Sequence, residues 1–282
     1  MDKQITEPAY GKINLTLEVL GTRPDGYHEI KSIMQSVELH DTLTFESTAD
    51  SAISLTGSDS RLKYDGSNLV IKAAEALRMA SGTSLGARIH LEKHIPIEAG
   101  MAGGSADAAA TLRGLNRLWG LDFSQDRLRE IGAAVGSDIP FCLAGGTAMV
   151  EGRGERVRPI AGPAPMALLV VKPEFGASTA RVYAGFDNLD QPEFEDHSAL
   201  LETALSEGKD FRAFLYNDLQ KVTTALYPEV REILDEMGRT VRCRLMSGSG
   251  PTCLCFGEPD ELQSLYVIFS KRYKDVFLTM TR

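Results

Sequence analysis

The sequence predicts an α+β protein built from two lobes. The chain of 282 residues is long enough for two domains of ordinary size. In its first half, β-like segments precede helical ones instead of alternating strictly with them, which is typical of an α+β arrangement. Residues 151–165 are rich in Gly, Pro and Arg and lack apolar periodicity, so we place the crossing between the lobes there. We therefore expect one domain over residues 1–160 and a second over residues 161–282.

The first lobe is expected to begin with strands and continue with helices. Apolar residues alternate with polar ones in its early segments, and they recur at helical spacing in its later ones. The predicted strands cover residues 12–20, 30–38, 41–45, 88–91 and 146–151. The predicted helices cover residues 69–79, 105–119 and 125–135. Residues 136–140, Gly-Ser-Asp-Ile-Pro, are expected to form a turn.

The second lobe is expected to be a small sheet backed by helices. The short apolar run at residues 166–171 predicts a buried strand. Helical spacing predicts helices over residues 211–219 and 229–237. Two further strands, at residues 244–246 and 252–256, flank a glycine-containing turn.

Composition excludes several classes of protein. The formal net charge of −9 argues against binding nucleic acid, which requires a basic face. The apolar run at residues 166–171 is far shorter than the roughly 20 residues that span a bilayer, so we expect no membrane segment. The first residues have neither a signal-peptide core nor an Arg-rich transit sequence, which favours a cytoplasmic protein. The expected partner is therefore a small molecule, and the expected state is a monomer or weak homodimer.

A glycine-rich segment at residues 96–109 is the strongest local signal. Gly100, Gly103 and Gly104 can adopt left-handed or close-packed conformations that side chains hinder. The segment leads into a predicted helix, whose unpaired N–H groups and dipole favour an anion such as phosphate. It lacks the Gly-Lys-Ser/Thr of a Walker loop and the Gly-x-Gly-x-x-Gly of a dinucleotide fold. A different family of phosphate-binding proteins is indicated.

Two charged residues are candidates for chemistry. Strand alternation places Lys12 and Asn14 on one face and Ile13 and Leu15 on the other. Asp138 stands in the predicted turn just after a helix. Taken separately, Lys12 also fits a solvated strand face, and Asp138 also fits a turn or helix cap.

Three motifs together resemble those of the galactokinase, homoserine kinase, mevalonate kinase and phosphomevalonate kinase (GHMP) superfamily. They are residues 8–15, residues 96–109 and residues 246–252, in the order of that superfamily. The resemblance implies a first lobe like the second domain of ribosomal protein S5 and a ferredoxin-like second lobe. It also implies ATP and Mg²⁺ as cofactors, with nucleotide and acceptor in the cleft between the lobes.

Within the superfamily, the chain most resembles kinases whose acceptor is a cytidine diphosphate sugar alcohol of the non-mevalonate isoprenoid pathway. The discriminating stretches are residues 23–29 (Arg-Pro-Asp-Gly-Tyr-His-Glu), 136–141 and 217–219. The resemblance implies ATP-dependent phosphorylation of a tertiary hydroxyl. Asp138 then corresponds to the catalytic acid that takes or orients the hydroxyl proton, and Lys12 to a lysine beside it.

The same resemblance assigns binding roles. ATP would be bound by Pro96, Gly100, Met101, Ala102, Gly103, Gly104, Ser105 and Asn68, with Asn68 near the adenine and Ser105 near the metal or β-phosphate. The acceptor would be bound by Asn14, Tyr27, His28, Thr179, Tyr183, Gly248 and Ser249. Tyr27 and Tyr183 would stack on cytosine, whose edge His28 would hydrogen-bond. The sequence leaves the metal ligands open.

The glycine-rich segment departs from the family pattern at a few positions. Glu98, Ala99 and Ala102 stand where some members have glycine. Asp107 is expected in the first turn of the helix, where it would favour Mg²⁺ or weaken ATP binding.

Two other functions stay open. One is a kinase for another small alcohol, such as mevalonate or homoserine, which Tyr27, His28 and Asn217 disfavour. The other is a nucleotide-binding sensor without catalysis, which the presence of both Lys12 and Asp138 disfavours.

Overall fold

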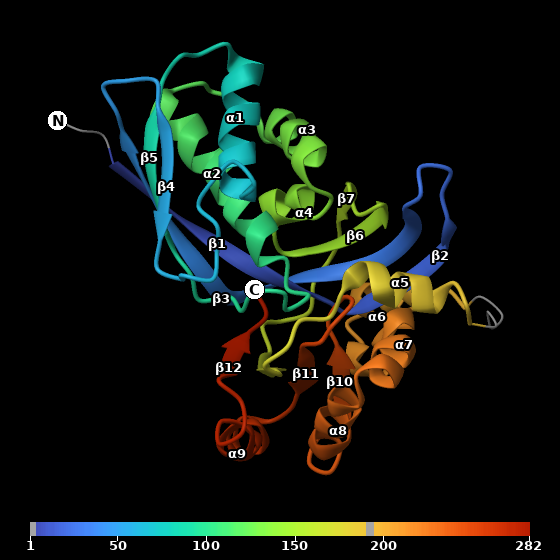
Figure 1. Cartoon of the computed structure of the whole chain (residues 1–282). Helices are drawn as coiled ribbons and strands as arrows, with labels where there is room; N and C mark the ends of the chain where they lie inside the picture. Colours follow the sequence, from blue (N-terminus) through green and yellow to red (C-terminus); the bar gives the residue numbers. More distant parts are fainter. Residues whose placement is uncertain (1–3, 190–194) are drawn as a thin grey trace.

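The computed structural model describes residues 4–189 and 195–282 and contains two β-sheets, one in each lobe (Figure 1). The eight strands of the first sheet are β1 (Gln4–Asn14), β2 (Thr16–Thr22), β3 (His28–Ser47), β4 (Ile53–Gly57), β5 (Ala87–Glu92), β6 (Thr147–Gly152), β7 (Arg156–Pro159) and β9 (Tyr216–Asn217). The second sheet is antiparallel, in the order β10 (Cys243–Met246), β11 (Cys253–Phe256), β8 (Ala167–Lys172) and β12 (Asp275–Met280).

The long strand β3 organises the first sheet. Strands β1 and β2 follow one another along one side of it, whereas β6 and β5 pair with its other side. The expected strands at 30–38 and 41–45 are therefore one strand of 20 residues. The expected strand at 12–20 is instead interrupted at Leu15, between β1 and β2. Asn14 and Leu17, on either side of this interruption, line the cavity between the lobes that is described below.

Four helices pack on the first sheet. They are α1 (Leu69–Ser81), α2 (Gly103–Trp119), α3 (Gln125–Val135) and α4 (Ile139–Ala144), and they lie on one face of it (Figure 1). Helix α2 is central, contacting β1, β3, α1 and α4. It approaches β3 closely because Gly114 faces Phe45, whose ring would lie 2.4 Å from an added Cβ. Gly114 thus lets α2 pack closely against the sheet, and this sets the position of the glycine-rich segment at the start of the helix.

The second lobe has the βαββαβ order of a ferredoxin-like fold. Its helices are α5 (Thr179–Phe186), α6 (His197–Ser206), α7 (Asp218–Leu226), α8 (Pro228–Met237) and α9 (Pro259–Phe269), with a 3₁₀ turn at Phe211–Phe214. Helices α8 and α9 pack against its sheet. Strand β9 comes from this half of the sequence but pairs with β2 of the first sheet. The boundary at residue 160 stays a prediction.

Several sequence-based expectations of secondary structure were wrong. The helix expected at 211–219 is a 3₁₀ turn followed by β9, because Asn217 accepts a hydrogen bond from the Leu219 N–H and starts α7 there. Strand β7 lies within the segment expected to be only a crossing. Helix α9 was missed although Glu258 and Glu261 form a capping box around Pro259, which is a recognisable sequence signal. In the part of the chain that the structure describes, no helix is long and apolar enough to cross a bilayer.

Candidate active site

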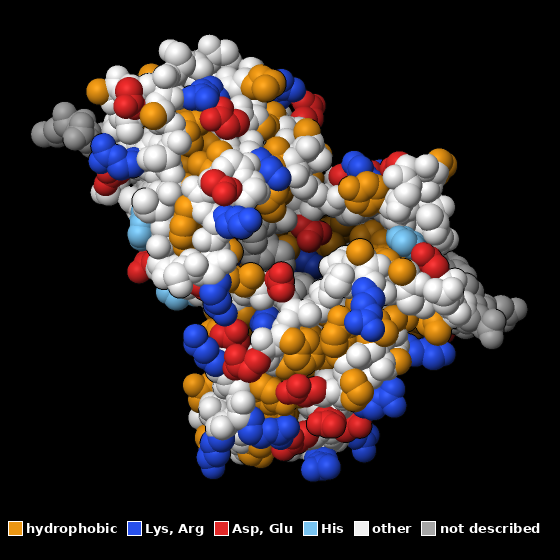
Figure 2. All heavy atoms as spheres, viewed as in Figure 1, with side chains coloured by type: hydrophobic (Ala, Val, Ile, Leu, Met, Phe, Trp, Pro, Cys, Tyr) orange, Lys and Arg blue, Asp and Glu red, His pale blue; other side chains and the backbone are white. Residues whose placement is uncertain are grey.

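A cavity of about 1030 Å³ lies between the two lobes. Figure 2 shows it as a hollow that contains acidic and basic side chains. All the residues predicted to bind ATP or acceptor line it, except Met101, which is fully buried. The three motifs, far apart in sequence, therefore meet in one cleft, and its size is suited to small-molecule ligands.

The glycine-rich segment ends at an uncapped helix. Helix α2 begins at Gly103, two residues earlier than expected, and Ala102 at its N-cap has no side-chain oxygen to accept a hydrogen bond. The N–H groups of its first turn are therefore not capped by a side chain and lie at the cavity wall. Together with the positive end of the helix dipole, they form a site for an anion such as phosphate.

Hydrogen bonds hold the glycine-rich loop against both lobes. The Gly100 carbonyl accepts hydrogen bonds from Lys12 Nζ (3.3 Å) and from Ser247 Oγ (3.1 Å). The Met101 carbonyl accepts one from the Lys12 backbone N–H (3.1 Å). The loop is therefore tied to strand β1 and to the turn that follows β10. Met101 contributes to the site through its backbone.

Replacing Gly100 with Ala should damage this junction. Gly100 has φ of +67°, and an added Cβ would lie 2.5 Å from the Ser247 carbonyl oxygen, which is backbone and cannot move aside easily. We expect a loss of unfolding free energy of about 2 kcal/mol or more, since left-handed strain alone costs roughly 1–2 kcal/mol. Urea denaturation measures it. Gly82→Ala is the control, because Gly82 has φ of +70° but open space around it. Equal losses in the two variants would contradict the predicted clash.

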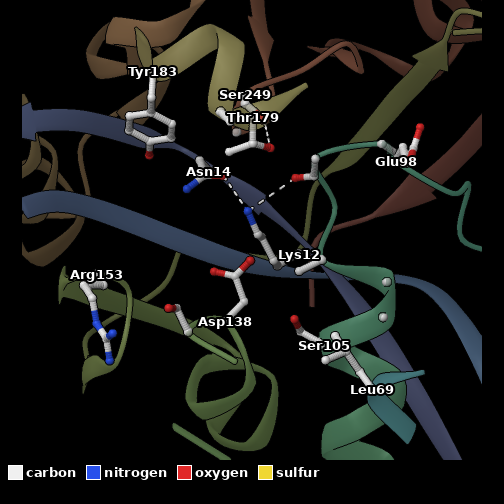
Figure 3. A pocket seen from close by; sticks show the side chains of 18 of the residues that line it. Lys12, Asn14, Leu69, Glu98, Ser105, Asp138, Arg153, Thr179, Tyr183 and Ser249 are labelled. Atoms are coloured by element: carbon white, nitrogen blue, oxygen red, sulfur yellow. Dashed lines mark hydrogen bonds between the residues drawn. The ribbon is translucent and has the colours of Figure 1, made fainter. Parts of the chain in front are cut away.

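Lys12 is held in position by buried polar groups. Its side chain points into the cavity from β1, and Nζ donates to Asn14 Oδ1 (2.8 Å; Figure 3). The Asn14 amide in turn donates from Nδ2 to Ser32 Oγ (2.8 Å). Both polar groups of Asn14 are thus engaged within the protein. In this structure Asn14 orients Lys12, and it also lines the cavity, so its acceptor-binding role stays a prediction.

Asp138 occupies the N-cap position of α4 but does not cap it. Its carboxylate makes no capping hydrogen bond. It lines the cavity instead, and in Figure 3 it points toward Lys12. In the described chain, no ion pair within 4.0 Å joins these two residues. The Lys12 ammonium is instead held by Asn14 and Gly100. The two groups face the same space without a direct contact, so a reacting group could lie between them.

Aromatic side chains line another end of the cavity, where Figure 3 shows Tyr183 across from Ser105 at the start of α2. His28 and Tyr183 are in ring contact, with centroids 4.6 Å apart, and His28 Nε2 lies 2.8 Å from Asp187 Oδ1. Tyr27 is 56% exposed, and the Arg153 guanidinium lies 5.0 Å from its ring centroid. Burial raises the pKa of the Tyr183 phenol above its ordinary value, which keeps that ring neutral. Arg153 and Asp187 were not identified from the sequence, because only folding brings them to Tyr27 and His28.

The second lobe contributes polar groups to the same cavity. Thr179, the first residue of α5, has its hydroxyl 2.9 Å from that of Ser249. Asn217 Nδ2 donates to the Gly248 carbonyl (2.9 Å) and so fixes the turn that carries Ser249. The predicted acceptor-binding residues of this lobe are therefore close together.

Two assignments on the nucleotide side need correction or comment. Asn68 caps α1, accepting from the Val70 N–H (2.9 Å) and donating to the Lys63 carbonyl (2.8 Å), so its amide is already engaged at the cavity wall. The expected place of Asp107 in the first helical turn is wrong, because α2 starts at Gly103. Asp107 is instead 2% exposed and hydrogen-bonded to Lys93. Asp107 still lines the cavity, so its effect on Mg²⁺ or ATP stays a prediction.

Sequence comparisons agree with this geometry. The GHMP kinases N terminal domain family matches residues 68–146, and the GHMP kinases C terminal family matches residues 197–275. A 4-diphosphocytidyl-2-C-methyl-D-erythritol kinase from Pelotomaculum thermopropionicum is 46% identical over 282 residues, covering 99% of this chain and 97% of the relative. The chain belongs to the 4-diphosphocytidyl-2-C-methyl-D-erythritol kinase family. A member of that family from Brevibacillus brevis is 40% identical over 280 residues, and the match covers 98% of this chain and 95% of the relative.

Solved structures place the family in its wider fold. A crystal structure of 4-(cytidine 5'-diphospho)-2C-methyl-D-erythritol kinase matches with a TM-score of 0.82 and 30% identity, covering 98% of this chain and 99% of its own. Homoserine kinase from Cytophaga hutchinsonii matches with a TM-score of 0.76 at 17% identity, covering 100% and 96%. The second likeness concerns the fold alone. The two-lobed GHMP-kinase fold expected from the three motifs is confirmed.

Proposed function

We propose that this protein transfers the γ-phosphoryl group of ATP to the 2-hydroxyl of 4-diphosphocytidyl-2-C-methyl-D-erythritol, giving the 2-phosphate and ADP. The step belongs to the methylerythritol phosphate route to isoprenoid precursors. Family membership supports the reaction. The observation that carries the proposal is the uncapped N-terminus of α2 in the same cavity as an Asp138 carboxylate that caps no helix.

The catalytic roles follow from the positions of Asp138 and Lys12. The Asp138 carboxylate accepts the proton of the attacking hydroxyl or orients it toward phosphorus. The Lys12 ammonium, held on the other side of this space, stabilises negative charge on the transferring phosphoryl group. A tertiary alcohol is a hindered nucleophile, so much of the rate enhancement must come from positioning the two reactants.

We assign the phosphates of ATP to the uncapped first turn of α2, where the proposed cofactor Mg²⁺ would also be held. In the described residues no cluster of three or more His, Cys, Asp or Glu side chains could hold a metal. That agrees with a Mg²⁺ ion that takes most of its ligands from phosphate and water. Ser105, which lines the cavity, is the hydroxyl we assign to it. When bound, the ion neutralises charge on the phosphates.

The aromatic end of the cavity binds the cytidine part of the acceptor. Tyr27 and Tyr183 offer ring faces for stacking, and His28 offers a ring nitrogen to the base edge. Arg153, beside Tyr27, supplies positive charge for the diphosphate of the acceptor. Thr179, Gly248 and Ser249 line the cavity from the second lobe and complete the pocket.

Replacing Tyr27 with Ala should chiefly weaken the acceptor. Base stacking is worth about 1–3 kcal/mol, which corresponds to a rise in acceptor KM of roughly 5-fold to 150-fold. The KM for ATP should stay within about 3-fold of wild type. Steady-state kinetics with each substrate varied in turn measures both. Tyr27→Phe keeps the ring and should retain most of the affinity. Equal losses for ATP and acceptor would contradict the assigned pocket.

The direct test of the function is ADP release by the purified protein with Mg-ATP. The acceptors compared are 4-diphosphocytidyl-2-C-methyl-D-erythritol, mevalonate, homoserine, galactose and none. Selective release with the cytidyl compound is expected. Release with another alcohol would overturn the acceptor, and no release with any acceptor would favour a sensor. The cytoplasmic location, the monomer or weak homodimer and the absence of nucleic acid partners stay predictions.

A further inference from the structure

A buried ionic cluster lies beneath the start of helix α2. Lys93, just after β5, bridges the carboxylates of Asp41 on β3 and Asp107 on α2. The three side chains are 5%, 0% and 3% exposed, respectively. None of them was assigned a role in the reaction above. Burying three ionisable groups is costly unless each is paired, so the arrangement calls for an explanation.

The cluster holds both ends of the glycine-rich loop. Asp41 Oδ1 accepts hydrogen bonds from the backbone N–H groups of His94 (2.5 Å) and Ile95 (2.8 Å), which immediately precede the loop. Lys93 also donates to Asp107 Oδ2 (3.1 Å), which lies in helix α2 one turn after the non-helical part of the segment, residues 96–102. The segment between these two anchors, which carries the uncapped N–H groups, is therefore fixed to the sheet on each side.

The loop itself needs such anchors. Glu98 and Ala102 both have φ of +54°, a left-handed conformation that costs non-glycine residues roughly 1–2 kcal/mol each. Strained backbone persists only where its surroundings determine it. Lys93 also lies close to the end of the loop, since a Cβ added to Gly103 would be 2.8 Å from Lys93 Nζ. The ammonium thus contacts the first residue of α2.

Asp107 has a second distinctive feature. Its Oδ1 is buried and, in the described chain, has no hydrogen-bond partner. Burial raises the pKa of Asp107 well above its ordinary value, against the attraction of Lys93 and with a further contribution from Asp41. Asp41, by contrast, accepts hydrogen bonds from three protein donors, namely Lys93 Nζ and the backbone N–H groups of His94 and Ile95.

We propose that Lys93, held by Asp41 and Asp107, is a positioning residue that keeps the glycine-rich loop in its nucleotide-binding conformation. The proposal rests on the proposed function in one respect, namely that this loop binds ATP. Lys93 and Asp107 line the cavity, but the Lys93 ammonium is already engaged by the two carboxyl groups. We therefore infer that Lys93 acts through the loop backbone.

The test is binding of a non-hydrolysable ATP analogue to the full-length protein by calorimetry, together with acceptor KM. Lys93→Met removes the ammonium and keeps the chain length. It is expected to weaken the analogue at least 10-fold, with acceptor KM within 3-fold. Asp107→Asn is expected to stay within 3-fold of wild type, because its amide oxygen can still accept the hydrogen bond from Lys93. Lys271→Met, an exposed lysine of the second lobe, is the control and should bind as wild type.

Each outcome decides a separate point. A folded Lys93→Met protein with wild-type affinity for the analogue would show a purely structural cluster and overturn the proposal. A loss in Asp107→Asn as large as that in Lys93→Met would overturn the assignment of Lys93 as the anchoring residue, because the Asn side chain keeps an acceptor for the Lys93 ammonium. If Lys93→Met does not fold, Asp41→Asn provides the same comparison, because its amide NH₂ faces the ammonium without accepting from it. Failure of the wild-type protein to bind the analogue would instead overturn the proposed function.

Discussion

Replacing Asp138 with Asn is expected to lower kcat by about 10²-fold to 10⁴-fold, the range for loss of a general base. The amide has nearly the same shape but cannot accept the proton of the attacking hydroxyl. Because the side chain makes no capping hydrogen bond, the change should leave helix α4 and the protein's stability intact. Single-turnover measurements of phosphoryl transfer, with binding of an ATP analogue measured in parallel, check this expectation.

The matched control for Asp138 is Asp126→Asn on the exposed face of α3. Asp126 forms an ion pair with Arg129 on the same helix, outside the cavity. Loss of such a surface pair costs at most about 1 kcal/mol of stability, so turnover should be unchanged. Turnover like that of wild type in Asp138→Asn would remove Asp138 from the mechanism. Loss of nucleotide binding in that variant would assign it to ATP instead.

Replacing Lys12 with Met is expected to lower kcat by about 10²-fold to 10³-fold, as for removal of one charge-stabilising donor. The ammonium is the group that faces the transferring phosphoryl, so the loss should appear in the chemical step. Stability should also fall by about 1–3 kcal/mol, since Asn14 Oδ1 and the Gly100 carbonyl lose a buried donor. Rapid-quench kinetics at saturating substrates, with urea denaturation, separates the two effects.

Lys209→Met is the control for Lys12. Lys209 is an exposed lysine whose side chain is 66% accessible, and it lies outside the cavity. It should turn over like wild type. If Lys12→Met lost only stability while the folded fraction kept its kcat, Lys12 would be a structural residue of the loop and not a catalytic one.

The sequence predicted the elements that have strong local signals. Helices α1, α3 and α8 carry regular apolar faces and lie close to their expected ranges. Short elements were lost because their signals are weak or non-local. Helix α4 has only six residues, and β9 has two that become a strand only by pairing with β2. The bounds of α2 were wrong at its start because Ala102 adopts a left-handed N-cap that its residue type does not favour.

Site residues followed the same division. Lys12, Asp138 and the glycine-rich segment could be identified from their order along the chain, and they line one cavity in the structure. Arg153 and Asp187 could not, because no spacing in the sequence relates them to Tyr27 and His28. Asn14 shows a third case. Its place at the cavity was predicted, whereas its hydrogen bonds to Lys12 and Ser32 could be found only in the structure.

The sequence by itself determined the family, the two lobes and the place of the glycine-rich loop, because these depend on residue types at short, fixed spacings. Only the tertiary structure decided which polar groups are free to act. Asp138 faces the cavity, whereas Asn68 is engaged as a helix cap. Asp107 lies in a buried cluster with Lys93 and Asp41, which are 14 and 66 residues away in the chain. Burial and hydrogen bonding between distant segments set these differences, and neither is encoded in local sequence spacing.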